Sequence, residues 1–296
     1  IEDKVINHLI AKYLLVDVYE NIYTNSMCAT RINKGSSYGI NLVKKYLNEI
    51  KYKNDNFYYL KLDIKKYFYN IDHDILKDIL NRKIKDKDAL EVLYRIIDST
   101  NSAYINDCIK KLKNNRIKYL NNLELIKETE EIPLYQYDKG CSIGNQTSQA
   151  FGLIYLCDFN HYLKEGLHLK HVVNYMDDFI IIHEDKKYLN YCLKKIEEYL
   201  INNLKLELNI NKTKINGVKN GIDFLGYRFI IKNNKIIMEL RNRVKNNFKR
   251  KIKNLILLVN NNYIDEKTFY KWLSSYNGLL KYENCKNLYY TYFKLQ

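Results

Sequence analysis

The stretch Val172-Val173-Asn174-Tyr175-Met176-Asp177-Asp178-Phe179-Ile180-Ile181-Ile182 decides the fold of this chain. Two runs of apolar, β-forming residues flank a pair of acids, which predicts a β-hairpin with carboxylates at its tip. Tight hairpin turns usually contain Asn-Gly or Gly, so Asp177 and Asp178 are not explained by turn formation. An isolated Asp-Asp pair is most often only a solvated turn, and the rest of the sequence has to decide between a turn and a site.

A third acid, Asp63, ends a second predicted strand. Residues 57–64 alternate between two faces, with Tyr58, Leu60 and Leu62 on one face and Asp63 on the other. Carboxylates brought close together repel one another unless a cation lies between them. Their hard oxygen atoms suit Mg²⁺, and two such ions can clamp the attacking and leaving oxygens of a phosphoryl transfer. The alternative is that Asp63 merely caps the strand.

The remaining sequence predicts a mixed α+β fold. Strands and helices interleave without regular βαβ alternation. A further short strand is expected near 222–231, and the stretch 102–138 is expected to be polar and irregular. Helices are expected at 1–20, from the turn Lys34-Gly35-Ser36-Ser37 to about 50, and at 74–82, 86–98, 147–163, 186–203, 240–260 and 266–280.

Composition narrows the function classes. The 296 residues carry a net charge of +15, which favours polyanionic partners, although an A/T-rich genome would produce the same lysine excess. We expect no signal peptide and no membrane span, because the longest apolar runs are short. The six cysteines are scattered, without metal-binding or disulfide spacing, so we expect reduced thiols and a cytoplasmic location.

Six ordered motifs resemble those of reverse transcriptases, and together they span nearly the whole chain. Tyr175-Met176-Asp177-Asp178 is similar to the YxDD hairpin of that family. The other five are Arg31-Ile32-Asn33-Lys34-Gly35-Ser36-Ser37, Leu62-Asp63-Ile64-Lys65-Lys66-Tyr67-Phe68, Ile143-Gly144-Asn145-Gln146-Thr147-Ser148-Gln149, Asn209-Ile210-Asn211-Lys212-Thr213 and Phe224-Leu225-Gly226-Tyr227-Arg228-Phe229.

The resemblance implies a right-hand polymerase. Its parts would be partial fingers at 1–56 that lack their N-terminal portion, a palm with an antiparallel sheet at 57–235, and a helical thumb at 236–296. The palm would include fingers-type helices and an insertion at about 83–138. The implied activity is RNA-directed DNA polymerase, a nucleotidyltransferase that adds deoxynucleotides to a 3′-hydroxyl. The implied partners are an RNA template with a DNA or RNA primer, and deoxynucleoside triphosphates.

The same resemblance assigns catalytic roles. Asp63 and Asp177 would bind two Mg²⁺ ions directly, with Mn²⁺ as a substitute, and Asp178 would be a weaker or outer ligand. Ile64 would offer its main-chain carbonyl to one ion. Lys212 would lie near the leaving pyrophosphate as a general acid, with Lys214 as a competitor and an ordinary solvated lysine as the alternative.

The nucleotide-binding residues would be Phe68, Ile143, Gly144 and Gln149. An aromatic ring at Phe68 would clash with a 2′-hydroxyl and so favour deoxynucleotides, unless it is only a core aromatic. Phe224, Leu225, Gly226 and Tyr227 would hold the primer end. Arg31 and Lys34, and the helix residues Arg241, Arg243, Lys245, Lys249 and Arg250, would bind nucleic acid.

That last helix has Val244, Phe248, Ile252 and Leu255 at helical spacing, so its basic residues would form an outer face, or simply a solvated one. Trp272 and the tyrosines Tyr276, Tyr282, Tyr289, Tyr290 and Tyr292 are expected to pack the thumb.

The middle motif narrows the resemblance. Most reverse transcriptases have Gln where this chain has Ile143, and Pro where it has Gln149. The pattern IGNxTSQ, together with Ser275-Tyr276-Asn277-Gly278-Leu279-Leu280-Lys281, resembles enzymes of diversity-generating retroelements, which copy RNA with errors at adenines. A small basic accessory protein would be a partner. The alternatives are an antiphage defence reverse transcriptase and a catalytically silent RNA-binding scaffold.

Overall fold

The computed structural model describes residues 2–53, 56–274 and 276. It forms two compact units, each built from separate stretches of the chain. The first unit contains residues 1–39 and 60–215, and the second contains residues 40–59 and 216–296. The expected division at 57 and 236 stays a prediction. The residues Tyr282, Tyr289, Tyr290 and Tyr292, and most of 275–281, lie outside the described residues.

A four-stranded sheet has the strand order β2-β3-β1-β4. Its strands are β1 (Tyr58–Asp63), β2 (His171–Tyr175), β3 (Asp178–His183) and β4 (Lys214–Gly217). β2 and β3 pair antiparallel, from His171 opposite Ile182 to Tyr175 opposite Asp178, which confirms the predicted hairpin. The side chains of Phe179, Ile180 and Ile181 are fully buried, as expected for a central strand that is covered on both faces.

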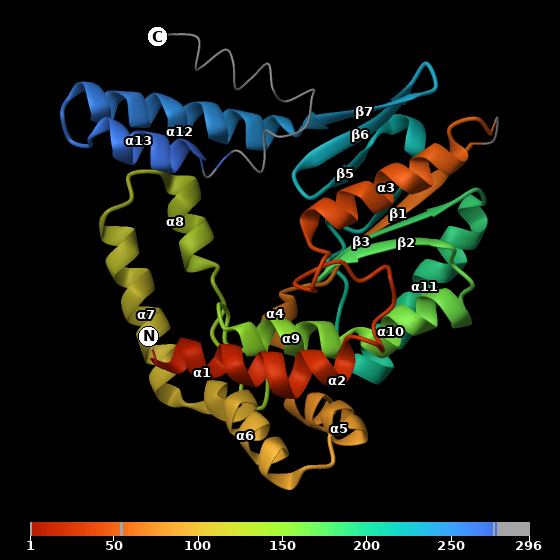
Figure 1. Cartoon of the computed structure of the whole chain (residues 1–296), viewed down its shortest axis with the longest axis horizontal. Helices are drawn as coiled ribbons and strands as arrows, with labels where there is room; N and C mark the ends of the chain where they lie inside the picture. Colours follow the sequence, from red (N-terminus) through yellow and green to blue (C-terminus); the bar gives the residue numbers. More distant parts are fainter. Residues whose placement is uncertain (1, 54–55, 275, 277–296) are drawn as a thin grey trace. The chain divides into compact units, whose positions relative to one another are not determined.

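Helices make up most of the first unit (Figure 1). Its central helix is α9 (Gln146–Tyr155), which buries almost every side chain and packs against α1 and α5. The other helices of this unit are α1 (Glu2–Ile10), a π-helical segment (Ala11–Val16), α2 (Asp17–Tyr19), α4 (Tyr67–Asn70), α5 (His73–Lys83), α6 (Lys87–Asp98), a 3₁₀ turn (Ser99–Asn101), α7 (Ala103–Lys118), α8 (Leu123–Glu130), α10 (Cys157–His161), a second π-helical segment (Tyr162–Gly166) and α11 (Lys186–Leu204).

The expectation that 102–138 is irregular was wrong, because α7 and α8 occupy most of it. α7 has no buried residue, so its sequence carries little of the apolar periodicity that marks a helix. Asn122 caps α8 by accepting N–H groups of Glu124 and Leu125, a local signal within a polar stretch.

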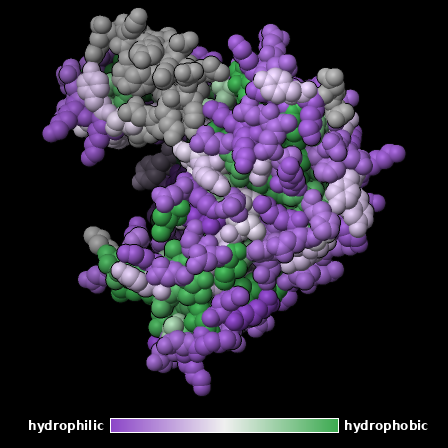
Figure 2. All heavy atoms as spheres, turned by 45° about the vertical axis from the view of Figure 1, so that its right-hand side comes forward, coloured by the Kyte–Doolittle hydropathy of each residue, from purple (hydrophilic) through white to green (hydrophobic). Residues whose placement is uncertain are grey.

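The first helix is where expected, but its apolar residues are largely exposed. Val5, Ile6, Leu9 and Tyr13 expose 48–57% of their surface, while Ala11 and Leu15 in the following π-helical segment are buried. Figure 2 shows hydrophobic side chains gathered in the lower half of the view, where α1 lies, on an otherwise mostly hydrophilic surface.

The second unit contains an antiparallel sheet followed by helices (Figure 1). Its strands β5 (Ile222–Phe224), β6 (Tyr227–Lys232) and β7 (Lys235–Leu240) are adjacent in sequence order. The helix α3 (Ser36–Ile50) contributes most of its length to this unit, and α12 (Asn242–Asn260) and α13 (Glu266–Ser274) pack on each other.

The sequence predicted reduced thiols and no membrane-spanning segment, and the structure bears on both only for the residues that it describes. Five cysteines there (Cys28, Cys108, Cys141, Cys157 and Cys192) are free thiols. Within the described part of the chain, no helix combines the length and the apolar character needed to cross a bilayer.

Candidate active site

The hairpin tip is built from a two-residue turn. Tyr175 pairs with Asp178, so Met176 and Asp177 form the turn, and Met176 takes a left-handed conformation with φ of +55°. Asn174, which is fully buried, donates from Nδ2 to the Met176 carbonyl at 2.9 Å and thereby supports that conformation. The main chain of Asn174 also bonds to Ser26 and Cys28, so an N-terminal loop holds the hairpin in place.

Asp63 lies at the end of β1, the strand next to β3. Asn209 holds it twice: its main-chain N–H donates to the Asp63 carbonyl at 2.8 Å, and its Nδ2 donates to Oδ1 at 2.9 Å. Lys212 Nζ lies 3.2 Å from Asp63 Oδ2. The Asn209–Thr213 motif therefore meets the first acid directly through Asn209 and Lys212, and the role of Lys212 as a general acid stays a prediction.

The three acids influence one another. Burial is the main cause that raises the pKa of Asp177 to about 6, and the negative charges of Asp63 and Asp178 add to it, against a main-chain hydrogen bond and the charge of Lys212, which lower the pKa. Asp178 lies 3.1 Å from Lys61 Nζ, so two lysines offset part of the negative charge. Carboxylates are hard oxygen donors that fit Mg²⁺, and the Ile64 carbonyl stays a predicted further ligand.

A separate group of metal-binding residue types lies in the same unit. Ligand atoms of His73, Asp98 and Asp138 lie within 4.8 Å of one another. Lys77 already contacts Asp98 at 2.6 Å, and Asn101 donates to Asp138 at 2.8 Å. These contacts account for the two carboxylates as ion-pair and hydrogen-bond partners that join α5, α6 and the loop before Gly140.

Phe68 is held against the central helix. Phe68 belongs to α4, and the residue that precedes this helix, Lys66, has a left-handed conformation. A Cβ on Gly152 of α9 would lie 3.1 Å from Phe68 Cε1 and 3.3 Å from Tyr67 Cε1. Glycine at 152 therefore allows the close approach of the two rings to the helix, and the Tyr67 hydroxyl bonds to the Gly152 carbonyl.

The loop that carries Ile143 and Gly144 is joined to the Phe68 segment. The Cys141 N–H donates to the Phe68 carbonyl at 2.8 Å, and the Gly140 N–H donates to the Ile71 carbonyl at 2.7 Å. Ile143 exposes 58% of its surface, and Gly144 has φ of +105°. Gln149, in the first half of α9, is half-buried.

Arg31 has a structural role that sequence reasoning did not anticipate. Its side chain is only 5% exposed, and its nitrogens bond to the Glu20 carboxylate and to the Glu20, Thr24 and Met27 carbonyls. All of its donors are used within the protein, so the expected contact of Arg31 with nucleic acid stays a prediction to which these bonds lend no support. Lys34 is more accessible, and burial together with the charge of Arg31 lowers its pKa.

In the second unit, Leu225 and Gly226 form the turn between β5 and β6, both with positive φ. Phe224 and Tyr227 on either side are buried. The Gly226 carbonyl accepts the N–H of Arg241, so this turn is seated at the start of α12.

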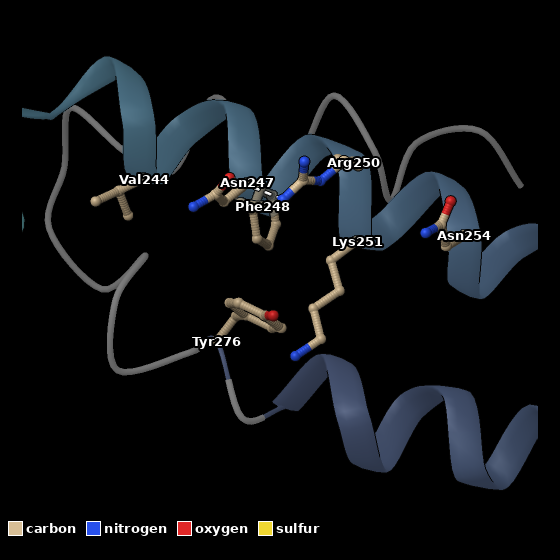
Figure 3. A pocket seen from close by; sticks show the side chains of 7 residues that line it. All are labelled: Val244, Asn247, Phe248, Arg250, Lys251, Asn254 and Tyr276. Carbon is tan, nitrogen blue, oxygen red and sulfur yellow. Dashed lines mark hydrogen bonds between the residues drawn. The ribbon is translucent and has the colours of Figure 1, made fainter. Parts of the chain in front are cut away.

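The basic helix buries three of the four apolar residues that its spacing predicted to face the core, and the fourth, Val244, is half-buried. Phe248, Ile252 and Leu255 are buried, whereas Arg243 and Arg250 are exposed. The rings of Tyr276 and Phe248 pack edge to face, with their centroids 5.0 Å apart. A cleft of about 420 Å³ lies beside them (Figure 3). Arg241 is partly engaged by Asp223, 3.4 Å away, and Lys245 and Lys249 are half-buried.

Three side chains at the acids were missed as site residues. Lys61 and Asn209 are separated in sequence from their carboxylate partners by 117 and 146 residues. Asn174 is a polar residue inside an apolar strand, and that position is the signal that could have identified it.

Comparison with solved structures defines the class. The fold matches Candida tropicalis apo telomerase truncated from its C-terminal domain, with a TM-score of 0.51, 15% identity, and coverage of 79% of this chain and 45% of that one. It also matches telomerase from the same organism in complex with the TWJ fragment of telomeric RNA, with a TM-score of 0.51, 14% identity, and coverage of 83% and 41%. The chain therefore has the right-hand polymerase fold.

The family follows from sequence. Residues 1–229 match the reverse transcriptase (RNA-dependent DNA polymerase) family, and the chain belongs to it. A Saccharomyces cerevisiae protein named for intron 2 of COX1/OXI3 is 23% identical over 248 residues, 73% of this chain and 28% of that protein. This chain spans less than half the length of each of these three proteins.

Proposed function

We propose that this chain is an RNA-directed DNA polymerase that adds deoxynucleotides to a 3′-hydroxyl. The observation that carries the proposal is the grouping of Asp63, Asp177 and Asp178, in which burial and the two neighbouring acids raise the pKa of Asp177. Such a group is costly unless a cation compensates it. Membership of the reverse transcriptase family supports the reaction type.

Asp63, Asp177 and Asp178, with the Ile64 carbonyl, would hold two Mg²⁺ ions. When bound, these ions would lower the pKa of the 3′-hydroxyl and neutralise charge on the leaving phosphates. Asn209 fixes the orientation of Asp63 through Oδ1, which leaves Oδ2 toward Lys212. Lys212, released from that ion pair, would supply a proton to the leaving pyrophosphate.

Selection of the nucleotide would fall to Phe68 and to the Ile143–Gly144 loop with Gln149. The ring of Phe68 cannot move closer to α9, because it already lies against the main chain at Gly152. A ring fixed in this way would exclude a 2′-hydroxyl. The primer end would be held by the turn at Leu225 and Gly226, and the RNA template with its primer by the basic face of α12, including Arg243 and Arg250.

A diversity-generating retroelement is the subclass that we favour, with a small basic protein as partner. The support is the Ile143 side chain, which is exposed, apolar and unable to form side-chain hydrogen bonds with a base. An antiphage enzyme would share the reaction but not the adenine-directed errors, so sequencing of products distinguishes the two.

The deciding experiment is primer extension on an RNA template with Mg²⁺ and deoxynucleotides, comparing wild type, Asp177→Asn and the surface control Asp107→Asn. Asp107 is exposed, and its carboxylate forms an ion pair with Lys110 at 3.7 Å. Loss of extension in Asp177→Asn alone supports the polymerase. Equal extension by all three proteins would rule out the assigned carboxylates, and binding of RNA without extension would favour a scaffold.

A further inference from the structure

The second unit contains a groove at the end of the β6–β7 hairpin. It has a volume of about 600 Å³ and lies between the C-terminal half of α3 and the turn that joins β6 to β7. Lys232 pairs with Lys235, so Asn233 and Asn234 form a two-residue turn, and both have positive φ. Asparagine tolerates this conformation well, so the turn has a defined shape.

The groove is basic. Lys44, Lys51 and Lys235 line it, and none of the described residues that line it is an acid. Asn48, Asn233 and Asn234 add three amide groups, each able both to donate and to accept hydrogen bonds. An anionic ligand that also offers polar edges matches this lining.

Tyr52 gives the groove an aromatic surface. The residue exposes 69% of its surface, and Lys51 Nζ lies 4.7 Å from the ring centroid. An exposed ring beside a cation suits a nucleobase, which stacks on the ring while its phosphate pairs with the lysine. An acidic peptide would use the lysines but would leave the ring without a matching partner.

We propose that this groove binds a single-stranded segment of RNA, with phosphates on the lysines, a base on Tyr52, and base edges or 2′-hydroxyls on the asparagine amides. The groove and α12 lie at opposite ends of β7, which has six residues and is therefore about 20 Å long. RNA at this groove would be held outside the duplex proposed for α12. The inference goes beyond the proposed function, because it requires no catalysis.

The test measures the affinity of a fluorescently labelled 12-nucleotide single-stranded RNA for the whole chain carrying Asp177→Asn, so that extension plays no part. The double variant Lys51→Gln/Lys235→Gln should bind about tenfold more weakly. It should also flatten the dependence of log affinity on log salt concentration by about 1.4, since each lost phosphate contact on a single strand contributes about 0.7.

A matched control removes two exposed lysines from the first unit, Lys83→Gln/Lys118→Gln. This pair has the same change in net charge and should alter affinity by less than about twofold. Equal losses in both double variants would mean that the RNA responds only to net charge, and the groove proposal would fail.

Tyr52→Leu tests the stacking step, because leucine keeps an apolar side chain but removes the ring. Affinity should fall about fivefold or more with an unchanged salt dependence. Cross-linking of 4-thiouridine RNA should label the peptide that contains Tyr52. The proposal is overturned if affinity does not change in Tyr52→Leu, or if poly-glutamate displaces RNA as well as unlabelled RNA does. Circular dichroism of each variant checks that it is folded.

Discussion

The hydroxyl group of Tyr135 accepts the main-chain N–H of Ile143 at 3.3 Å. The same hydroxyl donates to the Cys141 carbonyl at 3.1 Å, so one side chain spans both ends of the short loop. Gly140 allows this fit, because a Cβ there would lie 2.6 Å from the Tyr135 ring. Tyr135 lies near the C-terminal end of the polar stretch 102–138, and that stretch thereby contacts the loop proposed to bind the nucleotide.

Tyr135→Phe should loosen this loop without disturbing its packing. Two hydrogen bonds are lost, each with a net value of about 1 kcal/mol, while the ring stays beside Gly140. We expect hydrogen exchange at residues 141–144 to become about tenfold faster. The KM for deoxynucleotides should rise severalfold with a smaller change in kcat.

The neighbouring Tyr137, which exposes 78% of its surface, provides the matched control. Tyr137→Phe should leave both exchange and KM unchanged. If Tyr135→Phe accelerates exchange but leaves KM unaltered, the loop does not bind the nucleotide. Unaltered exchange would mean that the hydroxyl contributes nothing to the loop.

The hairpin that carries Asp177 and Asp178 could be predicted because its signals are local. Two runs of β-formers define the hairpin, and Asp177 and Asp178 fall at its tip whatever the rest of the chain does. The partners could not be predicted in the same way. Lys61 and Asn209 meet the acids through tertiary contacts across more than a hundred residues. Asn209 begins a motif that resembles one of the family, but no local pattern specifies its bonds to Asp63 or the contact of Lys61 with Asp178.

The errors have physical causes as well. The structural role of Arg31 was missed because a basic residue in a family motif favours a nucleic-acid contact, whereas burial beside Glu20 uses all of its donors within the protein. Helix α7 was missed because it buries no residue, and its stability therefore does not depend on an apolar stripe. Sequence patterns predict structure through burial, because apolar residues are usually buried and charged residues exposed. Arg31 is a buried charged residue, and α7 is a helix that buries none of its residues.

Ile143→Gln tests the subclass. Ile143 is 58% exposed, so the change should leave stability within about 0.5 kcal/mol. Glutamine restores a side chain that can form hydrogen bonds at the nucleotide, and we expect fewer misincorporations opposite template adenine. Sequencing of extension products on a defined RNA template measures this. Unchanged errors at adenine would remove Ile143 as their cause.

Phe68→Val should admit ribonucleotides. The smaller side chain leaves room for a 2′-hydroxyl, so the ratio of kcat/KM for deoxynucleotides to that for ribonucleotides should fall at least tenfold. Gly152→Ala is the complementary change, because its methyl group would lie 3.1 Å from Phe68 Cε1 and press the ring away from α9. This variant should lower kcat/KM for deoxynucleotides and not improve ribonucleotide use. A Phe68→Val enzyme with unaltered selectivity would leave Phe68 as a core aromatic only.

Asp177 should make the metal-free protein less stable as pH rises. Its pKa is about 6 when folded and near 3.8 when exposed, so between these values the unfolded chain loses the proton that the folded chain keeps. Stability therefore falls as pH increases from about 4 to about 6, and the full penalty persists above that. At about 1.4 kcal/mol for each pH unit, the penalty is roughly 3 kcal/mol.

Asp177→Asn removes the ionisable group and should remove this penalty. In EDTA, its Tm should exceed that of wild type by several degrees at pH 8 and match it near pH 4. Because a cation offsets the same charge, Mg²⁺ at pH 8 should raise the Tm of wild type more than that of the variant. A Tm difference that is the same at both pH values would point to altered packing, and an equal response to Mg²⁺ would place the ion away from Asp177.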